Sequence, residues 1–307
     1  MGTWNLEPGT WNLEPGTRNP EPGTRNQEPG NLEPGTRNLE QFHTVAVLVQ
    51  PIAVVTKPGG TSWWAQASAI ERVACGVGAL LFSSGVVHVA ILLGTGASWD
   101  GPLSLRKAAT FGLSFGLTLM NIVWVASFLE MSRTVRASLI GSFTAACALE
   151  TVLVTMQAWR GVPSHFNLET TFDGLVARAL AIGGAVLVAV ISWLMVAAWR
   201  RRPPVEDSFR VAIRLGLSIL VAAQLVGALM IARGMLLVFA GNPQAAYDTA
   251  GSLKPVHGVA MHGILVLPLL AYALSFVDWP EQRRLHIIRV ASAAYVLLTI
   301  VIFVWSA

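Results

Sequence analysis

The sequence predicts an all-α integral membrane protein, with about seven transmembrane helices in one bundle after a Gly- and Pro-rich N-terminal segment. Mean hydropathy is +0.57 and only 12% of the residues are charged, against about a quarter in ordinary soluble domains. Seven windows are long enough to cross a hydrocarbon core of about 30 Å at about 1.5 Å per helical residue. Continuous apolarity without period-two alternation favours helices over an outer-membrane barrel. The predicted spans are residues 73–95, 108–129, 137–158, 177–199, 212–239, 256–277 and 287–306.

Residues 1–41 are a low-complexity segment outside this bundle. They run GTWNLEP, GTWNLEP, GTRNPEP and GTRNQEP, followed by the shortened GNLEP and GTRNLE. Each unit carries Gly and lacks paired apolar positions, which excludes a coiled coil and indicates disorder. Two interpretations stay open: a real flexible tail, or upstream DNA translated from a miscalled start. Residues 42–70 are expected to be an irregular juxtamembrane segment, and residues 71–307 to form the transmembrane domain.

Lys and Arg near the span ends predict the orientation, because positive residues are retained in the cytoplasm. One side collects Arg72, Arg133, Arg136, Arg200, Arg201, Arg202, Arg210, Arg283, Arg284 and Arg289, and the other has Arg106, Lys107, Arg160, Arg178 and Lys254. The N-terminus is therefore predicted to be cytoplasmic and the C-terminus extracytoplasmic. The Ala, Val, Leu, Gly and Arg usage and the short loops favour a bacterial cytoplasmic (inner) membrane.

The net charge of +4 comes mostly from this cytoplasmic fringe, so it does not indicate nucleic-acid binding. The expected partners are membrane lipid and a small-molecule or ion ligand. The sequence leaves the oligomeric state open.

Polar residues gather at the predicted extracytoplasmic end of the spans. Ionisable groups inside a membrane usually face the bundle interior or a cavity. The stretch MQAWRGVPSHFNLETTFD, residues 156–173, joins the third and fourth spans at this end and is rich in polar groups. We therefore predict an outward-facing polar chamber with this loop as its lid or rim. Its expected residues are Glu150, Gln157, Arg160, His165, Asn167, Arg233, His257 and His262, with His88 nearby.

Structural roles are an alternative for several of these residues. Glu150 and Arg233 could form an ion pair between helices, since losing either partner would leave a charge in hydrocarbon. His88 could bond a neighbouring backbone group or serine, and Asp173 could begin the fourth helix. Ser164 and His165 are not expected to form a catalytic pair, because adjacency in sequence does not bring a hydroxyl to an imidazole.

The stretch KPVHGVAMHGILVLP, residues 254–268, is the densest chemical signal. His257 and His262 are five residues apart and project about 140° from each other on a helix, which argues against joint chelation of one metal. Pro268 is expected to kink this helix and to free a backbone carbonyl.

Three functions are compatible with these observations. The first is binding or transport of a small solute or ion, with proton exchange at Glu150 and a histidine and with Arg233 holding an anionic group. The second is a haem b redox protein acting with quinol, with His88 and His262 as axial ligands. The third is a non-catalytic sensor or assembly factor. The sequence is taken to lack hydrolase motifs of the GxSxG and HExxH types as well as kinase and dinucleotide motifs, so enzymatic activity is expected only as an oxidoreductase if haem is bound.

Overall fold

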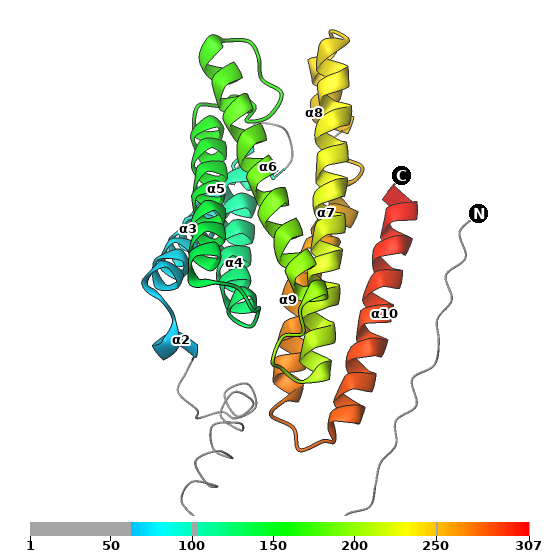
Figure 1. Cartoon of the computed structure of the whole chain (residues 1–307). Coiled ribbons are helices and arrows are strands. Elements are labelled where there is room, and N and C mark those ends of the chain that lie inside the picture. Colours follow the sequence, from blue (N-terminus) through cyan, green and yellow to red (C-terminus); the bar gives the residue numbers. More distant parts are fainter. Residues whose placement is uncertain (1–62, 97, 100–103, 250, 307) are drawn as a thin grey trace, which may run out of the picture. The chain divides into compact units, whose positions relative to one another are not determined.

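The structure, a computed structural model, describes residues 63–96, 98–99, 104–249 and 251–306, without the side chains of 247–249. These residues are all-α, and seven of their helices are long and apolar enough to cross a membrane (Figure 1). The seven are α3 (Ala69–Thr95), α4 (Arg106–Ser127), α5 (Arg133–Trp159), α6 (Thr171–Arg200), α7 (Asp207–Phe239), α9 (Lys254–Leu274) and α10 (Glu281–Ser306). The predicted all-α bundle of seven spans is confirmed.

The observed helices begin earlier than the predicted spans. Helix α6, for example, begins at Thr171 rather than at residue 177. The extra turns carry polar or charged residues, which a hydropathy window places outside the span. Two short helices, α2 (Trp63–Gln66) and α8 (Pro243–Thr249), were not predicted because neither has an apolar run of spanning length.

The predicted repeats and most of the juxtamembrane segment 42–70 lie outside the described residues. Its last part, residues 63–70, was expected to be irregular but contains α2 and the start of α3. A capping box explains that start: the backbone N–H and the hydroxyl of Ser68 both donate to Glu71 Oε2, at 2.7 and 2.8 Å. Arg136 of α5 lies 3.5 Å from the other oxygen of Glu71 and ties the two helices together.

Helices α3 and α4 pack with their backbones in close contact. A Cβ on Gly116 of α4 would lie 2.5 Å from the backbone nitrogen of Phe82, and one on Gly112 would lie 2.6 Å from the backbone nitrogen of Gly85. Only glycine fits such an approach. Close van der Waals packing of this kind holds membrane helices together, because lipid tails are as apolar as the side chains they would replace.

Helices α7, α9 and α10 pack on one another at the C-terminal end of the chain. The Tyr295 hydroxyl of α10 donates to the carbonyl of Val259 in α9, at 2.6 Å. Gly263 lets α9 approach α7, since a Cβ there would lie 2.9 Å from Ile219 Cγ2. Helix α6 packs against both α5 and α7, and α4 packs against α9, so two helix contacts join this group to α3–α5.

Pro268 lies inside α9, which continues through it to Leu274. Proline has no N–H, so the carbonyl of Ile264, four residues earlier, loses its helical donor. The side-chain amide of Asn121 in α4 donates to that carbonyl at 3.1 Å. The carbonyl that the sequence predicts to be free therefore has a partner from another helix.

The end of the bundle opposite the α5–α6 connection holds a second polar group. The backbone N–H of Ser208, in the first turn of α7, donates to Glu281 Oε1 at 2.7 Å. Arg284 lies 3.0 Å from Glu206 and 3.3 Å from Glu281. These contacts fasten the beginning of α7 to the beginning of α10, so these four side chains have structural roles.

Candidate functional site

The loop of residues 160–170, here called the lid loop, connects α5 to α6 and reaches two other helices. A Cβ on Gly234 of α7 would lie 2.5 Å from Phe166 Cζ, so the Phe166 ring lies directly on the α7 backbone. The His165 ring is centred 6.0 Å from that of Phe111 in α4. The predicted lid position is consistent with these contacts, because the loop bridges α4, α5, α6 and α7.

Both ends of the lid loop are set by local signals. Helix α5 stops at a Schellman motif, in which Gly161 has a φ of +66° and the N–H of Val162 donates to the Gln157 carbonyl at 3.1 Å. Phe166 has a φ of +65°, a left-handed conformation that costs free energy for a residue with a side chain. Its ring is only 8% exposed, and the burial of that ring holds the backbone in place.

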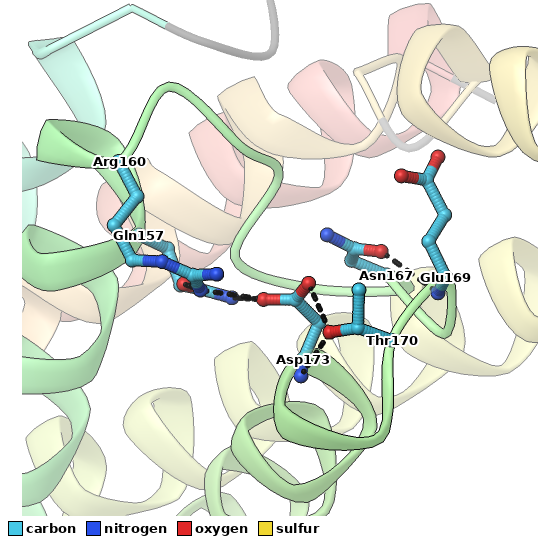
Figure 2. A network of polar contacts seen from close by, with 6 residues as sticks. All are labelled: Gln157, Arg160, Asn167, Glu169, Thr170 and Asp173. Carbon is cyan, nitrogen blue, oxygen red and sulfur yellow. Dashed lines mark hydrogen bonds and ion pairs between the residues drawn. The ribbon is translucent and has the colours of Figure 1, made fainter.

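Asp173 is the centre of a hydrogen-bond network that closes the lid loop onto α5 and α6 (Figure 2). Its Oδ1 accepts from Gln157 Nε2 at 2.9 Å and from Arg160 Nη1 at 2.6 Å. Its Oδ2 accepts from the Thr170 hydroxyl at 2.6 Å, and its backbone N–H donates back to that hydroxyl at 3.1 Å. The Arg160 guanidinium also donates to Gln157 Oε1 and stacks over the Phe172 ring at 4.8 Å.

Two predicted chamber residues, Gln157 and Arg160, therefore meet in this network. Gln157 is fully buried and Asp173 is 3% exposed, so their polar groups are satisfied by protein rather than by water. The network fixes the lid loop to its two flanking helices. Asp173 begins α6, with Thr170 as its N-cap, which agrees with the helix-start alternative.

His165 is held in the lid loop beside Ser164. The Ser164 hydroxyl lies 3.0 Å from His165 Nδ1, so the premise that adjacency in sequence does not bring a hydroxyl to an imidazole does not hold for this pair. The loop turns sharply after Pro163 and brings both side chains to one side. No carboxylate in the described part of the chain orients the ring, so a triad is not formed. Burial, together with the positive charge of Lys107, lowers the pKa of His165 to about 4, which keeps the ring neutral at pH 7.

Asn167 presents an unused donor. It is 1% exposed, and its Oδ1 accepts from the backbone N–H of Glu169 at 3.1 Å. Its Nδ2 is buried with no hydrogen-bond partner among the described residues, and it points away from Glu169 (Figure 2). A buried N–H group without an acceptor costs about 1–3 kcal/mol, which an acceptor oxygen on a ligand would recover.

Three cations act electrostatically on one another or on His165 where α4 and α9 begin. The positive charges of Lys254 and Arg106 both act on Lys107, and that of Lys107 acts on His165. Lys107 is half-buried, and none of the described carboxylates pairs with it or with Lys254. Helix N-termini carry partial positive charge, so Lys107 and Lys254 sit where a cation is least favourable. In the sequence, these three residues served only to predict the orientation of the chain, and they were not among the residues expected at the polar chamber.

Glu150 is buried where α5 meets α6. It is 4% exposed, and its Oε1 has no hydrogen-bond partner among the described residues. A Cβ on Gly183 of α6 would lie 2.5 Å from that oxygen, so the carboxyl group occupies the space that the glycine leaves. Glu150 lies seven residues before Gln157, which places it on the same face of α5 and about 10 Å deeper.

The interpretation of Glu150 and Arg233 as an ion pair is wrong. Arg233 is exposed and makes no ion pair with a described residue. Helix α7 runs from Asp207 to Phe239, and Arg233 lies about 39 Å along it, in its last two turns. Its side chain lies on the exposed side of the helix and not in the bundle interior.

The two histidines of α9 point in different directions, as their spacing predicts. The Nδ1 of His257 lies 2.8 Å from the carbonyl of Ala223 in α7, and its ring packs on Gly227. His262 is exposed, and its Nδ1 lies 2.6 Å from the carbonyl of Gly258 in its own helix. His257 therefore fastens α9 to α7, whereas His262 faces outward.

His88 does not fit the role of a haem ligand. Its Nδ1 lies 2.7 Å from the Ser84 carbonyl, and its Nε2 accepts from Trp159 Nε1 at 3.0 Å. Both ring nitrogens are engaged, whereas an axial ligand needs one free nitrogen. His88 faces α5, and the second proposed ligand, His262, faces outward from α9. The structure agrees with the alternative in which the His88 ring bonds a neighbouring backbone group, here the Ser84 carbonyl of the same helix.

The expectation that the chain lacks GxSxG is wrong, because residues 112–116 read GLSFG and match this pattern of hydrolases. In those enzymes the serine stands on a sharp turn between a strand and a helix. Here the motif lies inside α4, and its two glycines contact α3. The pattern in this chain reflects helix packing rather than a nucleophile.

No family model, no curated protein and no solved structure matches this chain. Its seven apolar helices make it a multi-pass membrane protein. Since a fold of this kind serves many activities, a function can be argued only from the groups that the lid loop brings together.

Proposed function

We propose that this multi-pass membrane protein binds a small oxyanion, a carboxylate or a phosphate, beneath the lid loop. The observation that carries the proposal is Lys107 itself, which is half-buried, has no carboxylate partner among the described residues, and is subject to the positive charges of Arg106 and Lys254. Cations in such proximity repel one another, and an anion between them replaces this repulsion by attraction. We assign the lid-loop end to the extracytoplasmic side from the distribution of Lys and Arg.

The groups around Lys107 supply hydrogen-bond donors that suit an oxyanion. The ammonium group of Lys107 has three N–H donors, and the buried Nδ2 of Asn167 in the lid loop is a further donor. His165 is neutral at pH 7 because its pKa is lowered to about 4. A bound anion near it favours the protonated ring, so binding is expected to take up a proton as the pH falls.

The buried carboxyl group of Glu150 favours transport, rather than sensing, as the function of this site. A carboxyl group buried in a membrane without an ionic partner is held in its neutral, protonated form. Its position, about 10 Å deeper than Gln157 on the same helix face, lies on a line from the lid-loop network into the bundle. We therefore propose that Glu150 holds the proton that accompanies the anion.

The thermal unfolding midpoint of the detergent-purified protein tests the binding step. Inorganic phosphate, sulfate, acetate, lactate, succinate and citrate are added separately at constant ionic strength. At least one is expected to raise the midpoint in a saturable manner, equivalent to about 2.7 kcal/mol at a concentration of 100 times Kd. Lys107→Gln should abolish the rise. Arg178→Gln removes one exposed charge from the same end of the bundle and should leave the rise intact.

Two results would overturn the binding proposal: no saturable rise with any of the six anions, or an equal loss of the rise in both variants. Uptake into proteoliposomes under an imposed pH gradient then separates transport from sensing. Glu150→Gln should retain the anion-induced rise in midpoint and lose proton-driven uptake. If the protein with an intact Glu150 binds the anion but shows no uptake, the site serves sensing.

A further inference from the structure

A groove runs along one face of α10. The side chains that line it are charged at one end, then small, and then apolar. The residues Arg289, Ser292, Ala293, Val296, Leu297 and Ile300 line this groove together with Leu215 of α7. Their spacing of three and four residues places them on a single helix face. The groove has a volume of about 400 Å³.

The groove runs from near the beginning of α10, where lipid headgroups are expected, toward the middle of the helix. Arg289 lies about 12 Å along α10 from Glu281, where the helix begins, and Ile300 lies about 16 Å further. An arginine at that depth extends its guanidinium to the interface while its aliphatic stem stays among apolar groups. The lower part of the groove is lined only by aliphatic side chains.

Arg289 is exposed and forms no ion pair with any carboxylate that the structure describes. The contrast with its neighbour is clear, since Arg284 contacts both Glu206 and Glu281. A guanidinium at a membrane interface favours an anionic partner, and a phosphate accepts two parallel N–H bonds from it. The positive end of the groove therefore calls for an anionic group.

Ser292 supplies a second, independent sign of a ligand. Hydroxyl groups in the middle of helices usually bond to the carbonyl four residues earlier, as those of Thr144, Thr151 and Thr299 do here. Ser292 is 2% exposed, and its Oγ has no partner among the described residues. A buried hydroxyl without a hydrogen bond is costly, and a ligand acceptor at this point would satisfy it.

We propose that the groove between α7 and α10 binds one anionic phospholipid. Its phosphate lies at Arg289, an ester oxygen accepts from Ser292, and one acyl chain lies along Val296, Leu297 and Ile300. The order of charge, hydroxyl and apolar surface along the groove is the order of phosphate, ester and chain in a phospholipid. Free phosphate would leave the apolar part uncovered. This site lies at the end of the bundle opposite the lid loop and is independent of the proposed anion site there.

Native mass spectrometry of the delipidated protein in neutral detergent tests this proposal. Phosphatidylglycerol and phosphatidylcholine with identical acyl chains are added in equal amounts, and the retained lipid is counted. One cation near a headgroup contributes on the order of 1 kcal/mol, which corresponds to about a fivefold preference for phosphatidylglycerol. Arg289→Gln should remove this preference, and Ser292→Ala should reduce the retention of both lipids, because both carry the ester oxygen.

Arg283→Gln is the matched control, because Arg283 lies on the same end of α10 but stacks over Trp279 at 4.0 Å, away from the groove. It should keep the preference, whereas Ala293→Phe should fill the groove and reduce retention of both lipids. Inorganic phosphate should not displace the bound lipid. Equal retention of the two lipids by the unaltered protein, an equal effect of the two arginine substitutions, or displacement by inorganic phosphate would each overturn the proposal.

Discussion

The side-chain amide of Asn121 in α4 donates a hydrogen bond to the carbonyl of Ile264 in α9, at 3.1 Å. That carbonyl has no helical donor because the residue four positions later is Pro268. The Asn121 amide therefore satisfies the Ile264 carbonyl within a membrane-spanning helix. It also joins α4 to α9, which lie far apart in the sequence. Unsatisfied backbone groups are costly in hydrocarbon, so this bond is expected to contribute strongly to the packing of α4 on α9.

Asn121→Leu should destabilise the protein by about 1–3 kcal/mol, since it leaves the Ile264 carbonyl without a donor. Pro268→Ala restores an N–H at position 268 and with it the helical hydrogen bond. The double variant should therefore lose less stability than the sum of the two single variants, as measured by thermal unfolding midpoints in detergent. Additive losses would show that the bond does not carry the effect.

Gly234→Ala should displace the lid loop, because the added methyl group would lie 2.5 Å from Phe166 Cζ. Overpacking of this kind costs about 1–3 kcal/mol, and the loop should become more sensitive to protease. Phe166→Leu should relieve the clash and suppress part of the effect. Gly258→Ala is the control, since a Cβ at that position meets nothing within 4 Å. Equal protease sensitivity in the two alanine variants would contradict the contact.

Asp173→Ala should destabilise the lid loop more than Arg160→Ala. Removing the carboxylate leaves the fully buried Gln157 amide without its acceptor and removes the partner of Thr170, at a cost of about 1–3 kcal/mol. Arg160 is partly exposed, with 39% of its side chain accessible, so its ion pair contributes only about 0–1 kcal/mol. Urea or thermal unfolding of both variants measures the difference, and a larger loss in Arg160→Ala would contradict this ranking.

Much of the fold could be predicted from the sequence because hydropathy is a local property. Each of the seven spans carries its own apolar run, and the spacing of His257 and His262 correctly separates their directions. The position of the 156–173 stretch at the end of two spans also follows from local information alone. The interior position expected for Arg233 is wrong, because its side chain lies on the exposed side of α7, and hydropathy does not give the direction of a single side chain.

The candidate site could be predicted only in part, because it depends on which helices pack together. Lys107 and Lys254 lie far apart in sequence, and the charge of Lys254 acts on Lys107 because α4 packs on α9. Hydropathy contains no information about that contact. The Asn121 side chain was missed for the same reason. Ser164 and His165 meet through the local turn of the lid loop, a geometry that residue spacing does not specify.

Gly183→Ala should perturb Glu150, because the added methyl group would lie 2.5 Å from Glu150 Oε1. The carboxyl group is the end of a flexible side chain, so it is expected to move rather than unfold the helix. Gly184→Ala is the matched control, since a Cβ there meets nothing within 4 Å. We expect Gly183→Ala to slow proton-driven uptake and Gly184→Ala to leave it unchanged. In a Glu150→Ala background, Gly183→Ala should cost no stability, because the clash is gone.

His165 should make the stability of the protein depend on pH between about 4 and 6.5. Burial lowers its pKa from the ordinary value of 6.5 to about 4 in the folded protein. Between these values the unfolded chain binds more protons than the folded protein, so stability rises with pH across the window and is level above it. Thermal unfolding midpoints from pH 4 to 7.5 measure this, with His165→Asn as the comparison, because both proteins share every other titrating group. The difference between the two midpoints should grow steadily as the pH falls below 6.5. A saturating anion should shrink that difference, because it stabilises the protonated ring beneath the lid loop. A difference that is constant with pH would show that His165 is not buried in its neutral form.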